Sequence, residues 1–441
     1  MNLLDTARKL VATGPVCDPC LGRPFADRSF GLTNEERGKA LRVSIALDDD
    51  EPYESPDRED CWVCEGHTAR FDTYAELVAD GLAGVEFATY QVGTRAPPLV
   101  EENEKLFRED AGMEADAGET FKSEFNREVG KRVGRLTGTD VDFDRPDILA
   151  VLDLERAGED PSSHAVDVQV NPAFVFGRYR KLERDIPQTD WPCRECGGSG
   201  VQLSTDEGEE PCDYCGGSGY LYDDSVESFV APHVLEAMDG DEAVFHGAGR
   251  EDVDALMLGT GRPFVVEVKN PRKRDPDAAA LEARINEEAG GSVEVEGLRL
   301  ATHEMVERVK ELDASKTYRA EVEFGGEVTE ADLDAAVDEL HGTTVVQHTP
   351  QRVDHRRASL DRERTVYDIS AALEDATHAT VEIHGEGGLY IKELISGDDG
   401  RTEPSLAGLL GVEATVTALD VLKVEGEDEA FDDPDYIRDE E

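Results

Sequence analysis

Eight cysteines, arranged as four Cys-x-x-Cys pairs, constrain the fold of this chain more than any other feature of its sequence. Two such pairs from separate parts of a chain can close a tetrahedral thiolate site around one metal ion. The N-terminus lacks the apolar segment of a signal peptide, and no apolar run is long enough to cross a bilayer. We therefore expect a cytoplasmic protein, in which disulfides are rare. The cysteines accordingly predict metal sites.

The first cysteine quartet combines Cys17 and Cys20 with Cys61 and Cys64, further along the chain. No histidine lies within either pair, so the donor set is closed and favours a structural Zn²⁺ ion over a catalytic one. Such an ion contributes folding energy to a segment with little apolar core of its own. The alternative is four unrelated reduced thiols. We assign residues 1–68 to an N-terminal zinc-binding region.

The second cysteine quartet consists of two near copies of one motif. Cys193 and Cys196 stand in CRECGGSG, and Cys212 and Cys215 stand in CDYCGGSG. The glycines after each pair let backbone N–H groups point at the sulfurs. The same spacing occurs in Hsp40-type chaperones, but this chain has no HPD tripeptide, which disfavours a chaperone. We expect residues 191–222 to form a second zinc module, although the sequence leaves open whether one or both quartets hold zinc.

The chain is very acidic, with 100 Asp and Glu against 45 Lys and Arg and a net charge of −55. The acidic residues are spread along the whole length, which favours adaptation to high salt over an acidic tail. Charge repulsion of this size is tolerable where salt screens it, since the Debye length falls to about 3 Å at 1 M salt. Basic clusters that persist in such a background are candidate nucleic-acid surfaces.

A short basic cluster of Arg178, Arg180, Lys181 and Arg184 surrounds Tyr179 and is a candidate RNA-facing surface, and two further clusters stand out. Phe121, Phe125 and Val129 recur at helical spacing and predict a helix over 121–135. Its polar face carries Lys122, Lys131 and Arg132, which we expect to face RNA; an ordinary solvated face is the alternative. The second cluster is rich in arginine, whose guanidinium group binds phosphate in a bidentate manner, and comprises Arg352, Arg356, Arg357, Arg362 and Arg364.

The stretch from Gly249 to Arg274 contains the candidate catalytic group. Gly249-Arg250-Glu251-Asp252 predicts a tight loop, and apolar segments on both sides of Gly259-Thr260-Gly261 predict a strand pair beneath it. A carboxylate beside an arginine suits nucleophilic chemistry, because the arginine and a second cation keep the acid ionised. The alternative is a surface ion pair in a hairpin.

The expected fold class is α+β, because strands outnumber helices in the second half of the chain and rarely alternate with them regularly. We expect an α/β module at 69–190 and a catalytic domain with a largely antiparallel mixed sheet at 223–441.

The residues around these motifs resemble pseudouridine synthases of the archaeal and eukaryotic Pus-ten type. Gly249 to Asp252 resembles the G-R-x-D loop of that family, and the segment GLYIKEL at 388–394 resembles its closing motif. The region 69–190 resembles, more weakly, a THUMP RNA-binding domain. The resemblance implies that Asp252 is the nucleophile and that Glu251 and Asp254 are not at the motif position. It also implies substrate-binding roles for Tyr318, Tyr390, Lys392 and Arg250.

The family resemblance implies a cofactor-independent isomerase that converts uridine to pseudouridine at tRNA positions 54 and 55, after the base leaves its stack. The expected partner is the TΨC arm of tRNA, with neither a membrane nor an obligate protein partner. The main alternative is a non-catalytic zinc-containing tRNA-binding protein. A thiolase or methyltransferase is disfavoured, because neither a pyrophosphate loop nor a methyl-donor fingerprint follows a predicted strand. The sequence leaves open which uridine is preferred, and whether ribose or pyrimidine is attacked.

Overall fold

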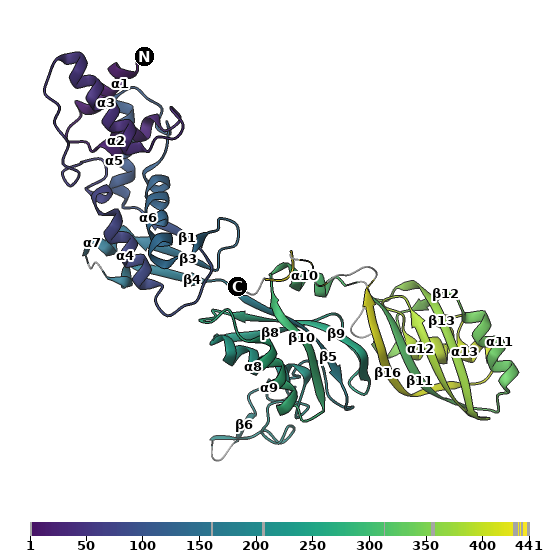
Figure 1. The fold of residues 1–441 in the computed structure, drawn as a ribbon. Helices are drawn as coiled ribbons and strands as arrows, with labels where there is room; N and C mark the ends of the chain where they lie inside the picture. The colour runs from purple at the N-terminus through teal and green to yellow at the C-terminus, as the bar shows by residue number, and fades with distance from the viewer. Residues whose placement is uncertain are drawn as a thin grey trace. The chain divides into compact units, whose positions relative to one another are not determined.

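The computed structural model describes residues 2–159, 162–204, 208–312, 314–353, 358–426, 431, 433 and 435–438. The chain divides into two compact units, Met1–Asn171 and Pro172–Glu441. Figure 1 follows them from purple to yellow. None of the helices in the described ranges is both long and apolar enough to cross a membrane.

The first unit is mainly helical and contains one small sheet. Strand order in the sheet is β2-β1-β3-β4, in which β1 runs parallel to β2 and β3, and β4 runs antiparallel to β3. The helices are α1 (Leu3–Val11), α2 (Asp18–Gly22), α3 (Asn34–Asp49), α4 (Phe71–Gly81), α5 (Pro98–Asp110), α6 (Phe121–Thr137) and α7 (Leu154–Glu159). The strands are β1 (Thr89–Arg95), β2 (Asp140–Val141), β3 (Ile148–Asp153) and β4 (Val166–Val170).

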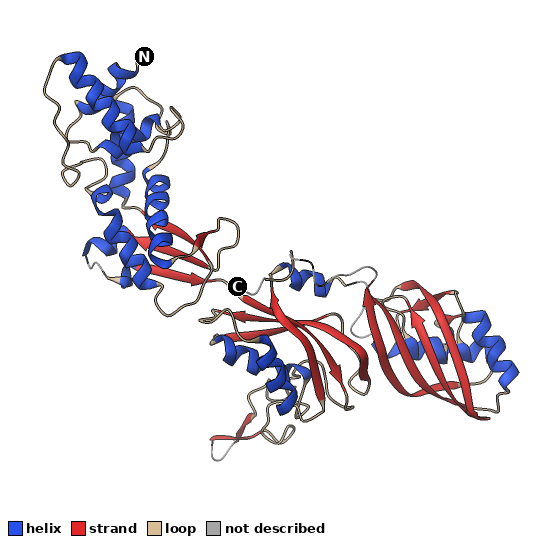
Figure 2. Ribbon diagram, in the orientation of Figure 1, coloured by secondary structure: helices blue, strands red, loops and turns tan. Residues whose placement is uncertain are grey.

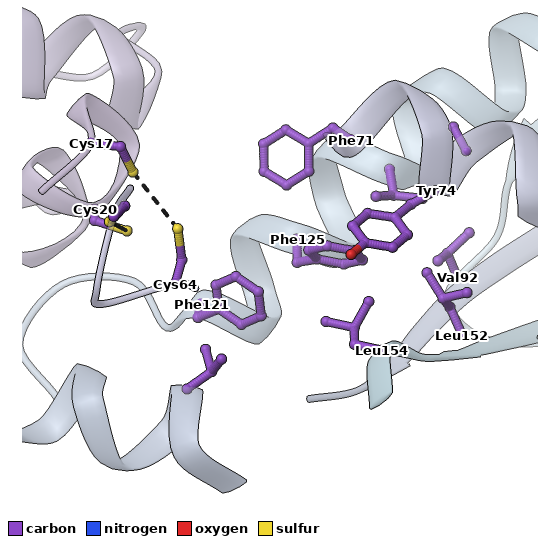
Figure 3. Close-up of a cluster of buried hydrophobic side chains, with 14 of the residues drawn as sticks. Cys17, Cys20, Cys64, Phe71, Tyr74, Val92, Phe121, Phe125, Leu152 and Leu154 are labelled. Carbon is purple, nitrogen blue, oxygen red and sulfur yellow. Dashed lines mark hydrogen bonds between the residues drawn. The ribbon is translucent and has the colours of Figure 1, made fainter. Parts of the chain in front are cut away.

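The core of the first unit is continuous from the cysteine-rich N-terminus to the sheet. Figure 3 shows Phe71, Tyr74, Phe121 and Phe125 meeting between these parts. The Phe125 ring lies 5.2 Å from that of Tyr74 and 5.6 Å from that of Phe71, between centroids. The predicted helix over 121–135 is α6, and its apolar positions are buried as expected. The predicted region 1–68 therefore shares one core with residues 69–171.

The second unit is built on a ten-stranded sheet of order β10-β5-β9-β16-β11-β14-β13-β12-β15, with β8 also paired to β9. Within this sheet of the described chain, β9 and β16 run parallel and the other neighbours run antiparallel. The expected largely antiparallel mixed sheet is confirmed. Its strands are β5 (Ala173–Lys181), β8 (Glu242–Gly247), β9 (Leu256–Lys269), β10 (Val293–Ala301), β11 (Ala314–Phe324), β12 (Thr344–His348), β13 (Asp361–Asp375), β14 (His378–Gly385), β15 (Thr402–Glu403) and β16 (Ala414–Gly426).

Helices cover this large sheet in two groups (Figure 2). One group packs on the strands β5, β8, β9 and β10, and the other packs near β11 to β16. A separate hairpin, β6 (Val201–Ser204) and β7 (Gly208–Pro211), joins the two halves of the second cysteine quartet. The helices of this unit are α8 (Val226–Met238), α9 (Ala278–Glu288), α10 (Glu304–Lys310), α11 (Glu330–Leu340), α12 (Ile391–Ser396) and α13 (Leu406–Leu410).

The structure corrects the expected domain boundary at residue 190. Residues 173–181 fell within the module expected at 69–190, yet they form β5, which pairs with β9 and β10 in the second unit. Most of its residues are buried, as in a central strand that is covered on both faces. The compact units therefore meet between Asn171 and Pro172.

The expected strand pair around Gly259 and Gly261 is one continuous strand, β9. Both glycines have positive φ, 57° and 68°, which bends the strand without reversing it. A Cβ atom at Gly259 would lie 1.9 Å from the carbonyl oxygen of Leu422 in β16. The glycine therefore permits close approach between β9 and β16, and the prediction of a turn was wrong.

The ring cluster of the first unit generates a stability prediction. Phe125→Ala should lower the free energy of unfolding of this unit by about 3–5 kcal/mol, because it leaves a cavity among packed rings. Urea unfolding followed by circular dichroism measures this cost. Phe143→Ala is the matched control, because the Phe143 side chain is 74% exposed and its loss should change little. Equal stability of the two variants would contradict this description of the core.

Candidate active site

A cleft of about 860 Å³ in the second unit brings the predicted site residues together. It lies between the loop after β8, strand β11 and the segment that leads into α12. These three elements are distant from one another in sequence, so the fold of the sheet assembles the site. The predicted residues that line the cleft are Arg250, Asp252, Tyr318, Arg352, Tyr390 and Lys392.

The carboxylate of Asp252 lies against two cations. The Nζ atom of Lys392 is 3.1 Å from Asp252 Oδ2, and Arg352 Nη1 is 3.6 Å from the same oxygen. The Asp252 side chain is 39% exposed, so it remains accessible from the cleft. Lys392 also pairs with Asp254 at 3.4 Å, and Arg352 pairs with the buried Glu393 at 2.7 Å. The accessible carboxylate oxygen of Asp252 is therefore in contact with two positive charges.

Tyr318 and Tyr390 reach the cleft from different elements. Tyr318 lies on β11, and burial raises its pKa to about 12, against the opposing effect of the positive charge on Arg262. Its hydroxyl therefore stays protonated at neutral pH. Tyr390 immediately precedes α12, and its backbone N–H and C=O form hydrogen bonds of 2.8 and 2.9 Å with the side chain of Gln347. Gln347 is fully buried and fixes this turn.

Beneath the Asp252 loop lies a buried polar network that was not predicted; the assignment of Tyr179 and Lys181 to an RNA-facing basic cluster was wrong, because both are fully buried. Arg262 Nε is 2.8 Å from Glu251 Oε2, and both side chains are only 1% exposed. The Tyr179 hydroxyl donates to the Glu251 carboxylate at 2.9 Å. Lys181 Nζ is 3.9 Å from Glu251 Oε1. We refer to Tyr179, Lys181, Glu251 and Arg262 as the buried network.

The buried network holds the backbone of the candidate nucleophile. Lys181 Nζ donates to the carbonyl oxygens of Asp252 at 3.2 Å and Val253 at 2.9 Å. Burial lowers the pKa of Lys181, although the negative charge of Glu251 opposes this effect. Burial, together with Glu251, raises the pKa of Tyr179 well above its usual value. A signal was present in the sequence, because Lys181 and Arg262 are charged residues beside apolar runs that form buried strands.

The two cysteine quartets each have the geometry of a tetrahedral thiolate site. Four sulfurs about 2.3 Å from a central Zn²⁺ ion lie roughly 3.8 Å from each other. In the first quartet, the Sγ distances are 3.9 Å for Cys17–Cys64 and 3.6 Å for Cys20–Cys61. In the second quartet, they are 3.9 Å for Cys193–Cys212 and 3.8 Å for Cys196–Cys215. Both donor sets therefore fit a zinc ion.

Backbone donors reach the sulfurs of the second quartet as predicted. The N–H group of Gly200 donates to Cys196 Sγ at 3.3 Å, and that of Gly219 donates to Cys215 Sγ at 3.2 Å. Equivalent bonds in the two halves agree with the repeat in the sequence. Such donors orient thiolate ligands and stabilise their charge.

The predicted basic helix face is neutralised in large part by acidic neighbours. Lys131 pairs with Glu128 at 3.3 Å, whereas Arg132 pairs with Asp72 at 2.6 Å and with Glu128 at 3.0 Å. Lys122 is exposed. These positions are accessible, but they do not form an isolated positive patch.

The arginines of the predicted cluster in the second unit each have different interaction partners. Arg352 faces Asp252 and Glu393, as described above. Arg362 donates to the Thr349 hydroxyl at 2.9 Å, and Arg364 pairs with Glu386 at 3.3 Å. The remaining two members of the predicted cluster, Arg356 and Arg357, lie outside the described residues.

Comparisons with known proteins match both units. The family model described as "Pus10, C-terminal" matches residues 174–425, and "Pus10 THUMP domain, archaeal" matches residues 74–153. The matched segment at 174–425 begins within β5, in agreement with the structural boundary. The THUMP domain inferred from the sequence is thereby confirmed.

Three relatives carry the name "tRNA pseudouridine synthase Pus10". The protein of Halorubrum lacusprofundi is 66% identical over 438 residues, which cover 99% of this chain and 100% of the relative. That of Methanothrix thermoacetophila is 42% identical over 452 residues, with 96% and 95% covered. That of Pyrococcus furiosus is 38% identical over 423 residues, with 96% and 98% covered. The genus of the first relative fits the adaptation to high salt that the composition predicts.

The buried network generates a second stability prediction. Arg262→Met should lower the free energy of unfolding of the second unit by about 3–5 kcal/mol, because it leaves the Glu251 carboxylate buried without its partner. Adding Glu251→Gln should recover part of this loss, because the buried carboxylate without its partner is then removed, while Lys181 keeps its backbone carbonyl acceptors. Urea unfolding of both variants tests the account. If Arg262→Met alone were as stable as the unaltered protein, this ion pair would not be what holds the loop.

Proposed function

Since this chain belongs to the Pus10 family of tRNA pseudouridine synthases, we propose that it isomerises the uridines at positions 54 and 55 in the TΨC loop of tRNA. The observation that carries the proposal is the Asp252 carboxylate, which is open to a cleft and lies 3.1 Å from Lys392. The reaction breaks the C–N glycosidic bond and forms a C–C bond between the same base and ribose. It therefore needs a positioned nucleophile and a proton carrier, but no external co-reactant.

In the proposed mechanism, the target uridine leaves its stack and enters the cleft. A volume of about 860 Å³ is sufficient for a nucleotide. Asp252 attacks the ribose or the pyrimidine ring, and Lys392, 3.1 Å from its carboxylate, holds it in place until then. Tyr390 stacks on the base, while Tyr318 supplies a protonated hydroxyl beside it. Arg250, which lines the cleft, fills the gap that the uridine leaves in the RNA stack.

We further propose that the tRNA is held by basic groups on both units. Phosphate binding releases counterions, and high salt weakens this contribution to affinity. Directed hydrogen bonds from guanidinium groups then matter more than overall charge, which fits the preference for arginine between 352 and 364. The groups assigned to tRNA binding are Lys122, Lys131, Arg132, Arg352, Arg356, Arg357, Arg362 and Arg364.

Both cysteine quartets are proposed to hold structural Zn²⁺, because their sulfur spacings fit a closed tetrahedral site. Neither quartet leaves a position for a reactive water molecule. We place the enzyme in the cytoplasm, where the reducing conditions keep thiolates available for metal binding. In this arrangement the metal contributes to folding and takes no part in the chemistry.

A charge-removing substitution distinguishes the enzyme from a non-catalytic tRNA-binding protein. Asp252→Asn should abolish pseudouridine formation in an unmodified tRNA transcript while changing the tRNA dissociation constant by no more than a few-fold. Site mapping of pseudouridine and a filter-binding assay, both at high salt, provide the two measurements.

Asp254→Asn is the matched control. It removes the same charge from a residue two positions further along the chain, whose side chain is more exposed. It should retain most of the activity. If the unaltered protein bound tRNA but formed no pseudouridine in the TΨC loop, the non-catalytic alternative would be correct.

Metal content tests the assignment of the quartets. The purified protein should retain two zinc ions per chain, and the double variant Cys196→Ala/Cys215→Ala should retain one. Inductively coupled plasma mass spectrometry after dialysis gives the stoichiometry. Because each quartet has its own donor set, loss of both ions from this variant would show that the sites are not independent. A protein that holds no zinc would refute the assignment.

A further inference from the structure

Trp191 is a cleft residue to which the mechanism above gives no role. It lines the cleft beside Arg250. The guanidinium carbon of Arg250 lies 5.3 Å from the centroid of the indole ring, within the range of a cation–π interaction. Arg250 is otherwise exposed. The side chain proposed to enter the RNA is thus held against an aromatic ring when no RNA is present.

The second cysteine quartet fixes Trp191 on one side. Trp191 stands two residues before Cys193, and its carbonyl oxygen accepts a hydrogen bond of 2.9 Å from the N–H group of Leu221. Cys193 N–H donates to the carbonyl oxygen of Gly219 at 2.7 Å. The Tyr222 ring meets the indole edge-on, with centroids 5.6 Å apart. Both ends of the cysteine module therefore converge on this tryptophan.

The body of the second unit fixes the same segment on the other side. Ser225, the N-cap residue of α8, donates from its hydroxyl to the Asp190 carboxylate at 2.5 Å. Gln188 Nε2 donates to the carbonyl oxygen of Gly249 at 2.8 Å and to the Tyr179 hydroxyl at 2.9 Å. Gln188 thus holds the backbone immediately before Arg250, and Trp191 holds the Arg250 side chain.

We propose that Trp191 is a positioning residue that holds Arg250 at the cleft for insertion into the RNA, and that the metal-loaded second quartet sets the position of Trp191. The role given to Arg250 rests on the proposed function. Cation–π contact at an exposed site is weak enough to be broken when RNA binds. Arg250 can then leave the ring as the uridine leaves its stack. In this way the second quartet, although distant from Asp252 in the sequence, controls the position of Arg250 at the cleft.

A double-mutant cycle tests the coupling between the two residues. Trp191→Leu should lower kcat/KM on an unmodified tRNA transcript by about tenfold, and Trp191→Phe, which keeps a ring face, should restore most of this loss. In an Arg250→Ala background, Trp191→Leu should cause no further loss. If the two losses multiply, Trp191 does not act through Arg250 and the proposal is overturned.

Fluorescence tests the same geometry without depending on activity. The chain has two tryptophans, so Trp62→Phe leaves Trp191 as the single indole fluorophore. In that background, Arg250→Ala should shift Trp191 emission and increase its quenching by acrylamide. Cys196→Ala/Cys215→Ala should do the same. Unchanged emission in both variants would overturn the proposal.

The two tests separate this proposal from the function it rests on. An unaltered protein that forms no pseudouridine in tRNA would refute the proposed function. The emission changes would still report the contact between Trp191 and Arg250 and its dependence on the metal site. An active enzyme with multiplicative losses in the cycle would refute the positioning role alone.

Discussion

The ion pair between Glu251 and Arg262 is the interaction on which the candidate active site depends. Both side chains are almost completely buried, so each charge is stable only because the other is present. The Tyr179 hydroxyl and Lys181 complete the surroundings of the carboxylate, and Lys181 also binds the backbone of Asp252. The next residue after a fully buried carboxylate is therefore the accessible one, Asp252. Two consecutive residues of one loop thus supply a buried structural acid, Glu251, and the proposed reactive acid, Asp252.

The remaining architecture brings distant segments to that loop. The parallel pairing of β9 with β16 places the Asp252 loop near β11, which carries Tyr318. Helix α12 then brings Lys392 to the Asp252 carboxylate. The buried ion pair beneath the loop is screened by salt much less than the partly exposed pairs of Asp252.

The sequence was sufficient to predict the residues that meet in the cleft, because short motifs and a family resemblance can be recognised without knowledge of side-chain packing. Asp252, Tyr318, Tyr390 and Lys392 all line it. It was not sufficient to identify Lys181 and Arg262, because their role comes from long-range pairing of β5 with β9. Because of the same pairing, the domain boundary lies at residue 171 and not at the predicted residue 190. The prediction of a turn at Gly259 was wrong, because glycine is required there for the close approach of two strands, and a turn would have required glycine equally.

The most direct test of the central claim is a structure of the Asp252→Asn variant bound to tRNA. The account predicts one TΨC-loop uridine turned out of its stack, with its ribose or base in contact with residue 252. Its base should lie against Tyr390 and near the Tyr318 hydroxyl. A bound tRNA whose TΨC uridines all remain stacked, or whose nearest uridine lies outside the cleft, would contradict the account.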